Sequence, residues 1–69
     1  MELGVSAFAE HFTIQMSSDA NLRKQPNEQG EIIGTVRADE ILTATGETDE
    51  WYQVMIDETV AYVNKNLVQ

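Results

Sequence analysis

The 69-residue sequence contains no cysteine and a single histidine, His11. Without cysteine there is no disulfide framework and no thiolate metal site. One histidine cannot form a histidine-cluster metal site. No apolar run approaches the ~20 residues that a membrane-spanning helix needs. We therefore expect no metal, no cofactor and no membrane insertion, and one small domain that is held together by its hydrophobic core alone.

Basic residues are also scarce, because four Lys and Arg stand against twelve Asp and Glu, for a net charge of −8. Nucleic acids and anionic lipids are bound through Lys and Arg, so this surface would repel both. We interpret the acidic residues as a solvated face that keeps a small domain soluble. A cationic ligand or a basic partner protein is the alternative. The acidic residues lack the Asp-x-Asp-x-Asp-Gly spacing of a calcium loop.

No catalytic constellation can be assembled from these residues. There is no cysteine nucleophile, and a Ser-His-Asp set would have to use His11 near the end of the chain. A glycine-rich phosphate loop is absent as well. We therefore expect that the protein is not an enzyme.

Short runs of strand-forming residues recur at intervals of about 8–12 residues, separated by turn residues. A chain of this size hides its strand edges best in a small closed or nearly closed barrel. The sequence therefore predicts an all-β, five-stranded SH3-like barrel with a short 3₁₀ turn near the C-terminus. The predicted strands are Phe12–Met16, Ile32–Arg37, Ile41–Thr45, Trp51–Ile56 and Thr59–Val63.

Two segments are predicted to lie outside these strands. Asn21–Asn27 is expected to be an extended loop, because Pro26 biases the residue before it away from helical angles. The spacing of Val5, Phe8 and Phe12 allows a short helical turn, and the same stretch is compatible with an extended lead-in. We expect residues 1–11 to be a lead-in or linker and residues 12–69 to be the domain.

Asp57 and Glu58 separate two strand-like runs, and a two-residue gap predicts a β-hairpin. Glu58 is poorly suited to a positive φ, so we expect a longer or irregular turn. The alternation of apolar residues also predicts the core. It consists of Phe12, Ile14, Leu22, Ile33, Val36, Leu42, Val54, Ile56, Tyr62, Val63, Leu67 and Val68.

The order of short motifs along the chain resembles the bacterial SH3 family. Asn21–Pro26 matches a family Asn-Val-Arg-Ser-Gly-Pro stretch, and Ile32–Thr35 matches a hydrophobic run that ends in Ile-Gly-Thr. Ala38-Asp39 stands at a Gly-Asp-type corner, and Trp51–Val54 fits a Trp-Tyr-x-Val strand. Ala61–Val63 matches the family's closing Gly-Trp-Val, and Asn64–Leu67 matches the short terminal segment after it. The resemblance spans about residues 12–68.

The resemblance implies a non-catalytic binding module of a bacterial envelope protein. Such modules target peptidoglycan peptides or dock to a neighbouring domain. We expect no signal peptide within these residues, and an extracellular or envelope location if they are part of a larger secreted protein. The oligomeric state stays open, with a monomer favoured. The alternative function is an acidic adaptor that binds a basic or proline-rich partner, although only Trp51 remains of the aromatic set that receives proline-rich peptides.

Trp51 is the leading candidate for ligand binding, since it begins a strand directly after an acidic loop and tryptophan is enriched at binding hot spots. The alternative is that it caps one end of the barrel, with its indole N–H bound to a backbone carbonyl. Arg23 and Lys24 are expected either to pair with nearby acidic residues or to anchor a ligand carboxylate. Together with Asp49 and Glu50, these residues predict a shallow groove between loops 23–31 and 46–50, with Trp51 on its floor.

Overall fold

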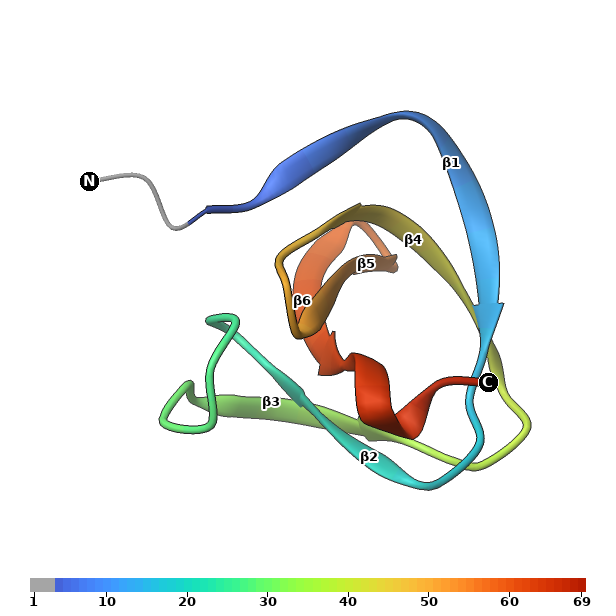
Figure 1. The fold of residues 1–69 in the computed structure, drawn as a ribbon. Coiled ribbons are helices and arrows are strands. Elements are labelled where there is room, and N and C mark those ends of the chain that lie inside the picture. Colours follow the sequence, from blue (N-terminus) through green and yellow to red (C-terminus); the bar gives the residue numbers. More distant parts are fainter. Residues whose placement is uncertain (1–3) are drawn as a thin grey trace.

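The computed structural model describes residues 4–69, which form six strands and one short 3₁₀ helix (Figure 1). The elements are β1 (Ser6–Gln15), β2 (Ala20–Arg23), β3 (Ile32–Val36), β4 (Ile41–Glu47), β5 (Trp51–Ile56), β6 (Thr59–Asn64) and η1 (Lys65–Leu67). All paired strands are antiparallel and form one sheet of order β1-β4-β5-β6-β2-β3. The all-β SH3-like fold and the 3₁₀ turn are confirmed.

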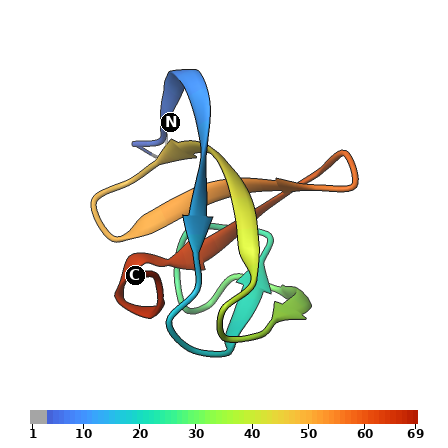
Figure 2. The same cartoon turned by 90° about the vertical axis from the view of Figure 1, so that its right-hand side faces the viewer.

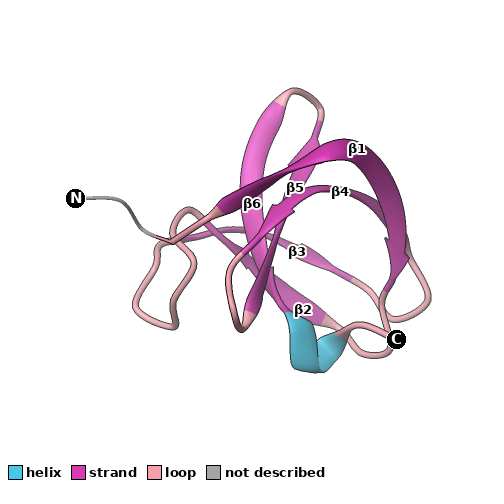
Figure 3. Ribbon diagram, turned by 45° about the horizontal axis from the view of Figure 1, so that its top comes forward, coloured by secondary structure: helices cyan, strands magenta, loops and turns pink. Residues whose placement is uncertain are grey.

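The strand count differs from the expected five, and the curled sheet is open, with β1 and β3 as its two edges (Figures 1 and 3). The additional strand is β2, which pairs with β3 along its length and with β6 through Arg23 and Tyr62. The predicted loop at Asn21–Arg23 is therefore wrong. Ala20 and Leu22 are buried while Asn21 is exposed, so the period-two signal was present in a stretch dominated by turn-forming residues.

The first strand is longer than predicted, since β1 begins at Ser6 and contains no helical turn. Its register with β4 jumps between Ala7, opposite Gly46, and Phe12, opposite Ala44. The β1 residues between these pairs outnumber those of β4 and form an irregular bulge, and β1 bends over the sheet there (Figure 3). The part of the predicted lead-in at residues 1–3 lies outside the described residues, and the domain boundary at residue 12 stays a prediction.

Most of the predicted core packs inside the curled sheet. Six of the predicted residues are buried: Ile14, Leu22, Val36, Val54, Tyr62 and Val63. Leu42, Ile56, Leu67 and Val68 are partly buried against the core. Phe12 and Ile33 were predicted wrongly, because they are 45% and 39% exposed. Both lie on edge strands, where no further strand covers the side chain. Met16, Ala20, Ala44 and Ala61 complete the core and were not predicted.

The β5–β6 hairpin turns through Asp57 and Glu58, whose φ angles are 49° and 69° (Figure 2). Two central residues with positive φ between the paired Ile56 and Thr59 are the signature of a tight type I′ turn. The hairpin prediction is confirmed, and the expectation of a longer turn is wrong. Pairing across the hairpin imposes positive φ even on Glu58.

Candidate functional site

The hairpin register separates two faces of the sheet. Tyr52 pairs with Val63 and Val54 pairs with Ala61, and this inner face packs on the core. Trp51 pairs with Asn64 on the opposite, outer face. Trp51 is only 6% exposed, yet it lies outside the hydrophobic core cluster. Its burial therefore comes from the outer face, where the β2–β3 hairpin and the C-terminal turn surround it.

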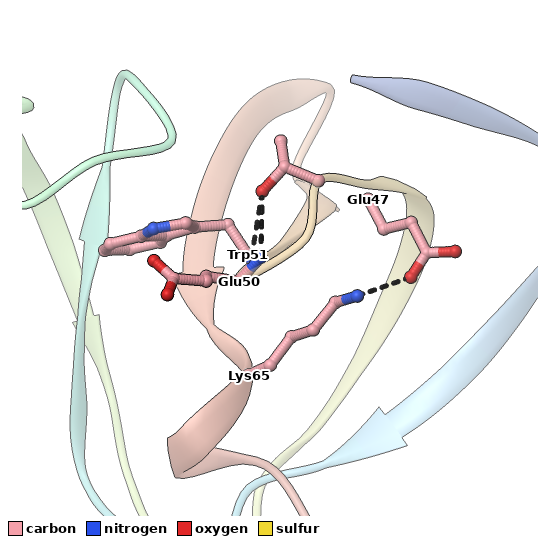
Figure 4. Close-up of polar contacts among 5 residues, drawn as sticks. Glu47, Glu50, Trp51 and Lys65 are labelled. Carbon is pink, nitrogen blue, oxygen red and sulfur yellow. Dashed lines mark hydrogen bonds and ion pairs between the residues drawn. The ribbon is translucent and has the colours of Figure 1, made fainter. Parts of the chain in front are cut away.

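Short backbone hydrogen bonds hold the loop before Trp51. The amide of Trp51 donates to the Thr48 hydroxyl at 3.0 Å (Figure 4). The amide of Thr48 donates to the Trp51 carbonyl at 2.8 Å. The amide of Lys65 donates to the Glu50 carbonyl at 2.9 Å. The β4–β5 loop is thus tied to both Trp51 and η1, which fixes the position of the indole.

The polar atom of the indole is left free. Within residues 4–69, Trp51 Nε1 donates to no acceptor of the chain. No side-chain polar atom of the described part is sealed from solvent without a partner. The Nε1–H group is therefore reached from outside, although the rest of the side chain is buried. The backbone carbonyl expected for a purely capping tryptophan is not found there.

Trp51 lines a cleft of about 380 Å³ between the β2–β3 loop and the β4–β5 loop. We call it the acidic cleft, because its charged lining residues are Glu28 and Glu50. Its other walls are Pro26, Asn27, Gln29, Thr48 and Asn64. The sequence predicted a groove at this place. Its two walls are the β2–β3 loop and the β4–β5 loop, with Trp51 between them.

A second cleft, of about 410 Å³, shares Trp51, Glu28 and Asn64 with the acidic cleft. We call it the central cleft, and it adds Asn21, Arg23, Asn66 and Leu67. Asn21 and Leu67 also line a distal cleft of about 400 Å³ that reaches Asp19 and Arg37. Because neighbouring clefts share wall residues, the three lie next to one another, with Trp51 lining both the acidic and central clefts. We refer to the three clefts together as the groove.

Three of the predicted site residues meet in this groove: Arg23, Glu50 and Trp51. Lys24 and Asp49 are exposed on the flanking loops and line none of the clefts described here. Arg23 donates to the Gly30 carbonyl at 3.0 Å, and among the described residues it forms no ion pair. The guanidinium thus keeps most of its N–H groups for other partners.

Sequence reasoning missed the amide wall of the groove, formed by Asn21, Asn64 and Asn66. Counting back across the two-residue turn places residue 64 opposite residue 51, so the hairpin signal contained the position of Asn64. Asn21 was missed together with β2. The side chain of Asn64 also accepts a hydrogen bond from the amide of Asn66 at 2.8 Å, which caps η1.

The ion pair of the described residues lies outside the groove. Lys65 Nζ is 2.6 Å from Glu47 Oε1 (Figure 4) and 5.1 Å from the ring centre of Tyr52. Tyr52 belongs to the inner face, and its ring meets Phe12 edge-on at 6.3 Å. These contacts close the end of the core and leave the acidic groups of the groove without a basic partner.

The chemistry of the groove is that of recognition. It offers a buried indole with a free N–H, primary amides, one guanidinium and two exposed carboxylates. Within residues 4–69, no group of three or more His, Asp or Glu side chains is placed to hold a metal ion. No helix in the described part is long and apolar enough to cross a membrane.

Comparison with known proteins adds one finding. The family model of the bacterial SH3 domain matches residues 18–69, which includes every residue of the three clefts. No curated protein matches the sequence.

Proposed function

Since the chain belongs to the bacterial SH3 domain family, we propose that it is a non-catalytic binding module whose groove at Trp51 takes a peptide of the bacterial cell wall. Members of this family are binding modules that often occur in cell-wall-associated proteins. The observation that supports the proposal is the buried Trp51 whose free N–H reaches a groove lined by polar side chains. A neighbouring domain of the same envelope protein is the other occupant that suits this groove.

In this proposal Trp51 forms the floor, and Arg23 and Glu50 form charged walls on either side of it. Lys24 and Asp49 stand on the two flanking loops and contact the parts of a large ligand that extend beyond the groove. A polymer such as peptidoglycan suits this arrangement, because many weak sites on one surface raise the apparent affinity of a module with a shallow site.

An acidic adaptor is the second candidate, and one observation favours it. Glu28 and Glu50 are both exposed beside Trp51, and within residues 4–69 neither forms an ion pair. A basic or proline-rich segment of a partner protein would complement this charge. Binding of that kind weakens strongly between ~0.05 and ~0.5 M salt, because exposed charges are screened over a few ångströms there.

Co-sedimentation with purified peptidoglycan tests the proposal. The wild-type domain should pellet with the polymer, and Trp51→Ala should stay in the supernatant. Because the chain has one tryptophan, the fluorescence of Trp51 reports directly on the groove. Soluble fragments of the same peptidoglycan should shift its emission, whereas binding elsewhere on the domain would leave the emission unchanged.

Trp51→Ala removes a buried side chain, so a second variant guards against loss of the fold. Asn21 is exposed on β2 and lines the central cleft, so Asn21→Tyr should fill the cleft without disturbing the core. The matched control is Thr43→Tyr, at an exposed position of β4 that lines none of the clefts. Equal sedimentation of both folded variants would count against the groove.

A further inference from the structure

The charges along the groove are unevenly distributed: one end has acidic side chains alone, and guanidinium groups occur only toward the other end. The acidic cleft contains Glu28 and Glu50 and no basic side chain. The central cleft adds Arg23, and the distal cleft adds Arg37 beside Asp19. One Asp19 carboxylate oxygen already accepts the amide of Ala38 at 2.8 Å. The groove is thus negative at the β4–β5 loop, and its guanidinium groups lie only in the central and distal clefts, where Glu28 and Asp19 accompany them.

Trp51 provides an observation that is independent of these charges. Its side chain is more than nine-tenths buried, its N–H has no acceptor in the described chain, and that group is still reached from the groove. An accessible donor left free beside a cleft is complementary to an acceptor on a bound molecule, such as a peptide carbonyl. The side-chain amides of Asn21 and Asn64 offer both donors and acceptors next to it, as a peptide backbone requires.

We propose that the groove binds a peptide in one direction, with a primary amine in the acidic cleft and a carboxylate at Arg23. This inference rests on the groove being the binding site, as proposed above. The ammonium group is held by Glu28 and Glu50 beside the indole, where charge-assisted hydrogen bonds and the ring both favour a cation. Arg23 uses one nitrogen for the Gly30 carbonyl and presents its remaining donors to the carboxylate.

The test uses peptidoglycan in three preparations: untreated, with its amines acetylated, and with its carboxyl groups amidated. For the wild-type domain, acetylation and amidation should each weaken co-sedimentation by about tenfold, the effect expected when a charged hydrogen-bonding group is removed. Glu28→Gln/Glu50→Gln should bind weakly and should respond no further to acetylation. Arg23→Gln should likewise respond no further to amidation.

Two control variants carry the same charge changes elsewhere. Asp57→Asn/Glu58→Gln removes two acidic groups at the far turn of the β5–β6 hairpin, and Lys65→Gln removes a basic group whose ion pair with Glu47 lies outside the groove. Both should keep the wild-type response to acetylation and amidation. If the controls also lose these responses, binding depends on the overall charge of the domain and not on contacts in the groove, and the proposed orientation is wrong.

The outcomes separate this inference from the proposed function. Failure of the wild-type domain to sediment with untreated peptidoglycan removes the proposed function and this inference together. Sedimentation that depends on Trp51 but is unchanged by acetylation and amidation leaves the groove as the site and overturns the amine and carboxylate assignments. If amidation weakens the co-sedimentation of Arg23→Gln as much as that of the wild-type domain, the assignment of the carboxylate to Arg23 is wrong.

Discussion

The two faces of the β5–β6 hairpin differ in chemistry although they come from the same short run of residues. Val54 and Ala61 on the inner face are almost completely buried among apolar side chains. Trp51 on the outer face is equally well buried, but among amide, guanidinium and carboxylate groups. The comparison teaches that burial alone does not identify the core in so small a domain. What surrounds a buried side chain decides whether it serves stability or recognition.

The largest effect should come from the inner face. Val54→Ala should lower the free energy of unfolding by about 2 kcal/mol or more, since it leaves a cavity in the core. For a domain of this size that corresponds to a fall in Tm of about 8–16 °C. Thermal unfolding measures the effect. Met55→Ala, one residue along and exposed on the outer face, is the control and should cost much less. An equal loss of stability in the two variants would show that the inner face contributes no more to stability than the outer face.

The turn belongs to neither face, and relieving its strain should raise stability. Glu58 has a φ of 69°, in the region where an L-residue pays roughly 1–2 kcal/mol and glycine does not. Glu58→Gly should therefore stabilise the domain by about 1 kcal/mol in urea unfolding. Sedimentation with peptidoglycan should not change. A destabilised Glu58→Gly variant would mean that the turn differs from the type I′ geometry.

A polar network on the outer face should contribute less than the core. Gln53 donates to the Tyr62 hydroxyl at 3.0 Å and accepts from the Thr45 hydroxyl at 3.1 Å. Tyr62→Phe removes the first bond and should cost about 1 kcal/mol. Because Tyr62 and Trp51 lie on the same outer face, we expect this variant also to shift the fluorescence emission of Trp51. Unfolding monitored by circular dichroism gives the energy, and no loss would show that the bond is not formed.

The smallest effect is expected at the exposed ion pair. Lys65→Met removes the contact with Glu47 and the cation above Tyr52, and should cost less than about 1 kcal/mol because the pair is solvent-accessible. Added salt should reduce the difference in Tm between the wild-type domain and the variant, because it screens the ion pair. A loss as large as that of Val54→Ala would place this end of the sheet among the main stabilising regions.

The inner face could be predicted from the sequence better than the groove. Alternation along Trp51–Ile56 and Thr59–Val63 identified the hairpin and most of the core, since each strand carries its own period. Phe12 and Ile33 were misjudged because the same pattern does not say which strands lie at an edge. Within the groove, Trp51, Arg23 and Glu50 were identified by residue type and by the acidic loop. Glu28 and the asparagines were not, because polar loop residues carry no periodic signal.

The local pattern and composition of the sequence were enough to predict the class of the fold and the lack of disulfide bonds. The ordered motifs of the sequence also pointed to the bacterial SH3 family, which the family match over residues 18–69 confirms. Only the tertiary structure decided that Ala20–Arg23 is a strand, that the sheet is open at β1 and β3, and that Trp51 faces away from the core. The physical reason is that strand order and register depend on pairing between distant segments. A cleft exists only once those segments meet.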